Sequence, residues 1–153
     1  MLFRSAVGAV GTIQANSADG NVMVPVDGKS YQHHATSHTD QRLFARIQTW
    51  YAGKMLRLLK ALDVRDPLEP AGKTVLYNSI VVWMAECMPA NHDSMSIPVT
   101  LFGNAGGALK AGVLVQAQGA TNKTLMQTIL KLLGVAASAA PQFGGDTITG
   151  LRA

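Results

Sequence analysis

The clearest pattern of apolar and polar positions along the chain is helical, and it begins near Thr39. Apolar side chains recur every three or four residues, at Leu43, Ile47, Tyr51, Met55, Leu58 and Leu62. This spacing places them on one face of a helix. The other side carries most of the basic residues, Arg42, Arg46, Arg57 and Lys60. Thr39 or Asp40 should cap the N-terminus, and the helix should end before Asp66, because a residue that precedes proline avoids the α region.

Runs of apolar residues further along the chain predict strands. Residues 74–84 (TVLYNSIVVWM) are almost continuously apolar, which is typical of a central strand covered on both faces. Residues 97–102 (IPVTLF) predict a second strand and residues 112–116 a short third one. Asn122 should cap a second helix that Gly134 ends. The order helix, strand, strand, strand, helix predicts an α/β fold in three layers.

The segment before the first helix gives weaker patterns. Residues 6–15 are small and apolar, which predicts a buried strand or the end of one. Residues 16–28 are rich in turn formers, and two short strands or an irregular excursion fit them equally well. Residues 33–40 are polar and are expected to be a hinge before the long helix. The last residues, 136–153, are expected to be irregular.

Composition narrows the classes of partner. Hydrophobic residues make up 48% of the 153-residue chain and charged residues 14%, a low charge that is typical of a piece of a larger globular protein. The net charge is +4, but the basic residues are scattered along the sequence, so no nucleic-acid partner is predicted. No apolar run reaches the ~18 residues that a membrane span needs. A single cysteine, Cys87, excludes an internal disulfide.

The candidate chemistry lies in the histidines. His34 and His38 are four residues apart, so a helical turn would place both imidazoles on one face, as a shared zinc-type ion requires. His33, Ser37 and Asp40 are supporting candidates, the last two as hydrogen-bond partners of the imidazoles. The alternative interpretation is a polar helix start whose histidines cap the helix or face water.

A second group of candidates follows the most apolar strand. Glu86 ends that strand, and the short segment after it contains Asn91, His92 and Asp93. A return of the loop could bring His92 to Glu86, since loops at the carboxyl ends of strands form the binding crevice of α/β sheets. Residues 103–107 (GNAGG) look like a phosphate cradle but lack the lysine of a P-loop, so a turn at the end of a strand is predicted.

These segments resemble, in order, an uncharacterised family of exported bacterial proteins named for an HXXSHH motif. His34-Ala-Thr-Ser-His38 resembles the motif, and residues 81–86 (VVWMAE) resemble the family strand that follows a long helix. Further matches are Asn91-His92 with residues 97–103 (IPVTLFG), then 106–112 (GGALKAG), 132–134 (LLG) and 143–146 (FGGD). The resemblance covers about residues 30 to 150. Thr39 departs from it, because the family has its last motif histidine there.

The resemblance implies a domain organisation and an export route. Residues 31–153 would be the C-terminal part of a single α/β domain of this family. Residues 1–30 would be a truncated N-terminal remnant. Independently of the resemblance, residues 2–5 (LFRS) are what one reading frame of a common sequencing adapter would encode, so residues 1–5 are a candidate for sequence that is not native to the protein. The remaining N-terminal half of the domain would then be a partner that this chain lacks. The family resemblance also implies an exported, periplasmic or cell-envelope location.

The family is in turn similar to the alkaline phosphatase and sulfatase superfamily. That similarity implies a three-layer α/β/α fold and a divalent metal, zinc, calcium or manganese. The implied ligands are His34, His38, Glu86 and His92. The nucleophile would come from the N-terminal half, so this chain alone should be inactive. Two functions remain open. One is hydrolysis of a small anionic phosphate or sulfate ester by the intact parent. The other is a non-catalytic exported or cell-envelope binding protein that keeps the fold.

Overall fold

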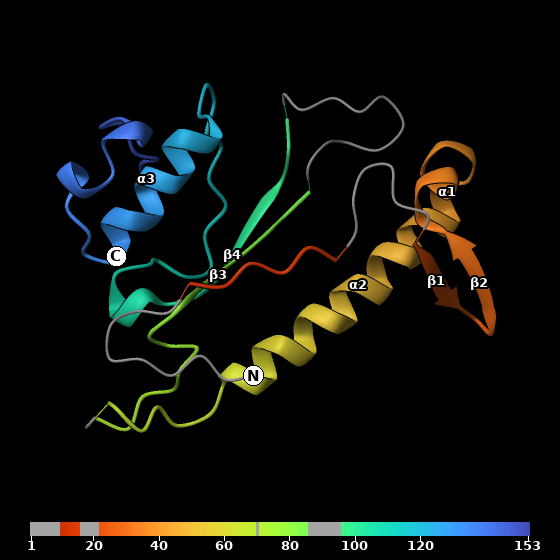
Figure 1. The fold of residues 1–153 in the computed structure, drawn as a ribbon, viewed down its shortest axis with the longest axis horizontal. Helices are drawn as coiled ribbons and strands as arrows, with labels where there is room; N and C mark the ends of the chain where they lie inside the picture. Colours follow the sequence, from red (N-terminus) through yellow and green to blue (C-terminus); the bar gives the residue numbers. More distant parts are fainter. Residues whose placement is uncertain (1–9, 16–21, 70, 86–95) are drawn as a thin grey trace. The chain divides into compact units, whose positions relative to one another are not determined.

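The computed structural model describes residues 10–15, 22–69, 71–85 and 96–153. The chain divides into two compact units, the first made of residues 1–61 and 83–100 and the second of residues 62–82 and 101–153. Helices and short strands are mixed along it, so the α/β class expected from the sequence is confirmed in that general form. Figure 1 shows the elements in sequence colours.

The first unit is built around a hairpin and a long helix. Strands β1 (Met23–Val26) and β2 (Lys29–Gln32) pair antiparallel, with Val26 opposite Lys29. Asp27 and Gly28 form the two-residue turn, and both have positive φ, 50° and 76°. An Asp-Gly pair favours this hairpin turn because both positions need the left-handed region. The described part of residues 16–28 therefore contains one strand and the turn after it, while the second strand of the hairpin lies beyond that segment.

Two helices follow the hairpin. Helix α1 (His33–Thr39) occupies the segment expected to be a hinge, and α2 (Gln41–Leu62) is the long helix that the periodicity predicted. Asp40 separates them and caps α2, since its Oδ1 accepts a hydrogen bond from the backbone N–H of Leu43 at 3.0 Å. The prediction of a cap at Thr39 or Asp40 is therefore confirmed, while the hinge is a helical turn.

The core of the first unit lies between the hairpin and the N-terminal half of α2 (Figure 1). Val24 and Val26 alternate with exposed residues along β1 and bury their side chains against Ile47. Tyr31, Leu43, Trp50 and Tyr51 pack around these three. The predicted stripe of α2 is thus the buried one in this half of the helix, and Trp50 widens it.

The segment predicted as one strand from Thr74 to Met84 divides into two parts. Residues 75–78 form a turn, and only Ile80–Met84 form a strand, β3. The Thr74 Oγ1 accepts from the N–H of Tyr77 at 3.1 Å, and the Ser79 hydroxyl donates to the Val75 carbonyl at 2.7 Å. Such local bonds from Ser and Thr compete with a strand ladder, so the length of the strand was overestimated.

Strand β3 pairs with β4 (Val99–Gly103), and all five residues of β3 are half-buried. The expected third strand is wrong. Residues 112–116 have no strand partner among the residues that the structure describes, and Leu114 is 96% exposed. The expected strand at residues 6–15 also fails over its described part. Residues 10–15 have no regular structure, and Val10 and Ile13 are 88% and 80% exposed. Residues 6–9 lie outside the described chain.

In the second unit, α3 (Asn122–Leu132) packs against the C-terminal turns (Figure 1). Thr121, one residue before the predicted cap, forms a capping box with Thr124. Gly134 ends the helix at φ 76°, as predicted. The tail has two short 3₁₀ turns, η2 (Ala137–Ala139) and η3 (Pro141–Phe143), and Arg152 forms a bridge with Leu109.

Candidate functional site

The two histidines of the motif meet on α1. Their imidazole centres lie 4.9 Å apart with the rings inclined at 63°. His34 is half-buried and His38 is exposed. Two imidazoles on one tetrahedral zinc, with Zn–N bonds near 2 Å, have ring centres about 5 Å apart. The pair therefore has the separation that a shared ion requires, and it can supply two ligands from one helical turn.

Backbone contacts hold this helical turn in place. The N–H of His33 donates to the Val22 carbonyl at 3.0 Å, which joins the start of α1 to the beginning of the hairpin. The Thr36 hydroxyl donates to the Gln32 carbonyl at 2.7 Å. The Asp40 N–H donates to the Thr36 carbonyl at 3.0 Å and closes the helix. A seven-residue helix is too short to be stable alone, so these bonds to its neighbours maintain the histidine spacing.

His33 belongs to the packing of the unit. Its ring contacts Phe44 and Tyr51 of α2, with centre distances of 5.3 Å and 5.5 Å. Its Nε2 lies 3.5 Å from the amide nitrogen of Gln48, and its Nδ1 is buried without a hydrogen-bond partner in the described residues. Burial lowers the pKa of His33, and the neighbouring His34 lowers it further. An imidazole that packs between two aromatic rings of α2 fits a structural role better than a ligand role.

The expected partners of the imidazoles are engaged elsewhere. The Ser37 hydroxyl donates to the backbone carbonyl of His34 at 2.7 Å, and Asp40 caps α2. Thr39 donates its hydroxyl to the Ala35 carbonyl at 2.9 Å. Ser37 and Asp40 thus position the helix backbone here, and Thr39 does not direct its oxygen toward the histidine pair.

The other predicted site residues cannot be placed beside this pair. Glu86, Asn91, His92 and Asp93 lie outside the described residues, as does Cys87. Within the described part of the chain, no three histidine, cysteine or acidic side chains come together as a metal site would require. The structure therefore brings together His34 and His38 from the predicted set, and the roles of Glu86 and His92 stay predictions.

The glycine-rich loop after β4 is a turn, as the sequence indicated. The N–H of Ala105 donates to the Ser79 carbonyl at 3.1 Å and that of Gly106 to the Tyr77 carbonyl at 2.9 Å. The N–H groups of Gly107 and Leu109 both donate to the Asn104 carbonyl at 3.0 Å. A phosphate cradle needs free amide groups that converge on the ligand. These amides are already used within the protein.

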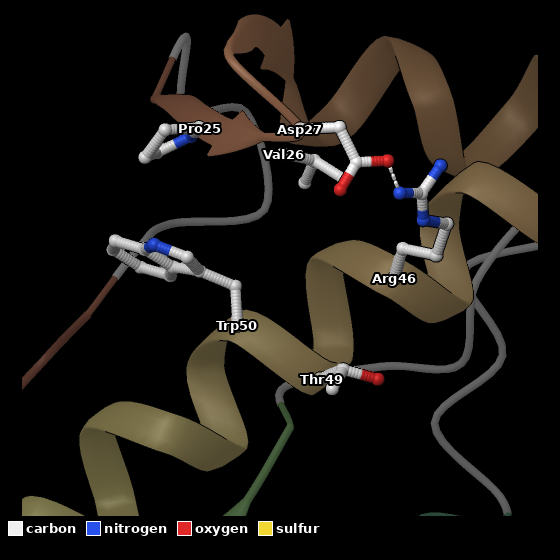
Figure 2. A pocket seen from close by; sticks show the side chains of 6 residues that line it. All are labelled: Pro25, Val26, Asp27, Arg46, Thr49 and Trp50. Carbon is white, nitrogen blue, oxygen red and sulfur yellow. Dashed lines mark ion pairs between the residues drawn. The ribbon is translucent and has the colours of Figure 1, made fainter.

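A hollow of about 280 Å³ lies between the hairpin turn and α2 (Figure 2). Its described lining is Pro25, Val26, Asp27, Arg46, Thr49 and Trp50. The Asp27 carboxylate forms an ion pair with the Arg46 guanidinium at one end, and the Trp50 ring lies opposite Pro25 at the other. Lys54 stacks its ammonium 4.4 Å from the centre of the Trp50 ring. This hollow was not predicted, although the turn formers of residues 16–28 and the basic side of the long helix are signals in the sequence that contribute to its lining.

The second unit has a hollow of about 250 Å³ between α3 and the tail. Two cations, Lys131 and Arg152, and the hydroxyl-bearing residues Thr128, Thr147 and Thr149 contribute to its lining. Thr128 joins the two sides, since its Oγ1 accepts from the N–H of Ile148 at 2.8 Å. The described lining contains no histidine, cysteine or carboxylate, so it adds nothing to the predicted metal site.

Comparison of the chain with protein-family models, with curated proteins and with solved structures gives no match in any of the three. In the described residues, no helix is both long and apolar enough to cross a membrane.

Proposed function

We propose that His34 and His38 form half of a divalent-metal site in an exported, HXXSHH-type hydrolase of small phosphate or sulfate esters. The observation that supports this is the 4.9 Å separation of the two imidazole centres on a helix whose start is bonded to the residue before the hairpin. Zinc accepts neutral imidazole nitrogens as ligands. Calcium and manganese prefer oxygen ligands, so a pair of histidines favours zinc among the three.

The remaining ligands in this proposal are Glu86 and His92. A bound metal would polarise the ester oxygen and lower the pKa of an attacking group. The nucleophile would come from a preceding half of the domain, so activity would belong to a longer parent. The parent would have the three-layer α/β/α fold, with β3 as one of its inner strands. The half-burial of every β3 residue supports this, because a strand that still lacks neighbours and covering helices leaves both faces partly open.

A specific observation favours a second function, that of a non-catalytic binding protein of the cell envelope. The Thr39 hydroxyl is used by the helix backbone, and the position where the HXXSHH family has its last motif histidine thus offers no imidazole. A site that has lost one ligand binds metal more weakly, and a chain that retains the fold without metal would need no ester substrate.

Metal titration distinguishes the two functions. Zinc and manganese would be titrated by calorimetry into the 153-residue chain, into His34→Ala and His38→Ala, and into His92→Ala. The matched control is His33→Phe, which preserves the aromatic packing of His33 but removes its ring nitrogens. We expect one equivalent of zinc to bind the unaltered chain and the control. The zinc affinity of the other three variants should be at least tenfold lower. If all variants bound zinc equally, or if the well-folded unaltered chain bound none, the metal site would be excluded and the second function would be favoured.

A further inference from the structure

Four cations lie along one exposed face of α2. Arg42, Arg46, Arg57 and Lys60 are all exposed. At about 100° per residue, they fall within a sector of about 60° around the helix axis. Thr49, Gly53 and Leu56 lie in or beside the same sector. We call these seven residues the basic face of α2. The basic residues that look scattered in the sequence thus form a line in the folded helix.

The charge on this helix is of one sign. Helix α2 contains five Lys and Arg residues and no Asp or Glu in its 22 residues. Asp27 of the hairpin pairs with Arg46, but both side chains remain open to solvent, at 70% and 52% exposure (Figure 2). An exposed pair of this kind is weak and leaves the arginine able to exchange its partner. Within the part of the chain that the structure describes, the basic face forms no other ion pair.

Asp66 and Glu69, which follow α2 closely in the sequence, are used in their own loop, whereas Asp63 is a single exposed carboxylate directly after the helix. Asp66 accepts from the N–H of Leu68 and from the amide of Asn78, at 2.9 Å and 3.1 Å. Glu69 accepts from the N–H of Ala71 at 3.0 Å. The nine acidic residues of the chain occur singly in the sequence, so it has no acidic run that could cover four cations. The complementary negative charge should therefore come from a partner.

The shape of the face favours a flat partner. Arg42 and Lys60 are about 27 Å apart along a straight helix, at about 1.5 Å per residue. The small residues Thr49 and Gly53 lie between the two cation pairs, so nothing bulky projects there. A plane of headgroups can meet all four cations at once, whereas the backbone of a duplex curves away from a straight rod. Leu56 is 51% exposed beside the cations. Burying a leucine side chain in a lipid interface is favourable because it removes apolar surface from water, whereas a phosphate backbone offers no such burial.

We propose that the basic face of α2 docks on a membrane surface rich in anionic phospholipid. The helix axis lies parallel to the membrane plane, the cations contact headgroup phosphates, and Leu56 enters the interface. The contact is peripheral and does not require a membrane-spanning helix. It is independent of the proposed metal site, because none of its residues lies on α1.

The expected effect of each cation follows from the surface potential of such membranes. A Lys or Arg near an anionic leaflet contributes about 1 kcal/mol, or about fivefold in affinity. Replacing two cations should weaken binding by about 25-fold. Because the interaction is electrostatic, raising the salt concentration above about 0.15 M should weaken the binding of the unaltered chain as well.

The test is sedimentation of the full chain with vesicles. One set contains phosphatidylcholine and phosphatidylglycerol in equal parts, and the other contains phosphatidylcholine alone. Arg57→Gln/Lys60→Gln removes one cation pair and retains good helix formers. Lys123→Gln/Lys131→Gln is the matched control, with the same change in charge on α3. Leu56→Gln tests the apolar contact. Circular dichroism would check the helix content of each variant.

We expect the chain to bind only the anionic vesicles, the α2 variant to bind about 25-fold more weakly and the α3 control to bind like the unaltered chain. Leu56→Gln should weaken binding severalfold. Equal losses in the α2 and α3 variants would overturn the proposal, because net charge alone would then explain binding. Equal binding to neutral vesicles would also overturn it, as would tighter binding to a DNA duplex at the same salt. If the α2 variant failed to fold, the test would rest on Leu56→Gln and on the salt dependence of the unaltered chain. Vesicle binding that neither the substitution nor added salt weakened would then overturn the proposal.

Discussion

The backbone N–H of Ile148 donates a hydrogen bond to the Thr128 hydroxyl at 2.8 Å, across twenty residues of sequence. The same hydroxyl donates to the Thr124 carbonyl at 2.7 Å, so one side chain satisfies a helix carbonyl and the N–H of the tail. Thr128 is 4% exposed. The tail is therefore attached to α3 through a buried polar contact that neither segment could make locally.

Replacing Thr128 by valine should destabilise the chain by about 1–3 kcal/mol, because it leaves the N–H of Ile148 without an acceptor while the shape of the side chain is preserved. Thr128→Ser retains the hydroxyl and is the matched control, with a smaller loss from the missing methyl group. Urea unfolding followed by circular dichroism would measure both variants. If the valine variant proved as stable as the unaltered chain, a water molecule would have to replace the Thr128 hydroxyl as the acceptor of the Ile148 N–H.

Asp40 should be important for the start of α2. Asp40→Ala removes the side-chain acceptor of the Leu43 N–H and should cost about 0.5–2 kcal/mol of stability. Asp40→Asn should cost much less, since asparagine caps helices about as well. Thermal unfolding of the two variants would give the difference. Equal losses would mean that the charge of Asp40 matters more than the cap.

The buried imidazole of His33 predicts a dependence of stability on pH. Because its pKa in the folded chain lies below the ordinary histidine value of 6.5, the unfolded chain binds more protons between these two pKa values. The neutral form therefore contributes its full stability above pH ~6.5, and this contribution is lost as the pH falls toward the folded pKa.

Unfolding free energies at neutral and mildly acidic pH would test this for the unaltered chain and for His33→Phe. We expect the phenylalanine variant to lose less stability on acidification. His34→Gln is the control, and it should retain most of the dependence, because burial is the larger cause of the shift. An unchanged slope in His33→Phe would assign the dependence to other histidines.

Gly103 is the glycine that should tolerate substitution least. It has φ 96°, and a Cβ there would lie 2.2 Å from the Ser79 carbonyl oxygen and 2.8 Å from that of Leu76. Both obstacles are backbone atoms, which cannot move aside cheaply. Gly103→Ala should therefore cost more than about 4 kcal/mol, in the range that marks severe strain.

Gly134→Ala separates steric conflict from backbone conformation. Gly134 also has a positive φ, 76°, but nothing lies within 4 Å of its would-be Cβ. The free energy of unfolding of this variant should fall by only about 1–2 kcal/mol, the cost of placing an alanine in the left-handed conformation. Chemical denaturation of both variants gives the comparison, and similar losses would show that the close approach at Gly103 relaxes easily.

Local patterns in the sequence predicted the elements that depend on neighbouring residues. The helical stripe containing Leu43 and Ile47 gave α2, and the Asp27-Gly28 pair marked a turn that became the hairpin. The cap at Asp40 and the stop at Gly134 were also predicted. These features depend on periodicity, φ and short-range hydrogen bonds, which a few consecutive residues determine.

Predictions of strands, which need partners far away in the sequence, were less accurate. Residues 112–116 have the composition of a strand but no ladder partner in the described chain, and Leu114 stays exposed. The Thr74 and Ser79 side chains shortened β3 by bonding to nearby backbone. Of the predicted site, the i, i+4 spacing of His34 and His38 was enough to bring their rings together, because a single helical turn fixes it.

The sequence by itself determined where α2 begins, where α3 ends, which face of α2 is apolar and which two histidines share a turn. Only the tertiary structure decided that His33 faces the rings of Phe44 and Tyr51 while His34 meets His38, although the two are neighbours in the sequence. Successive residues on a helix point about 100° apart. Which of them is buried depends on where the hairpin and α2 pack, and that packing is set by contacts between segments far apart in the chain.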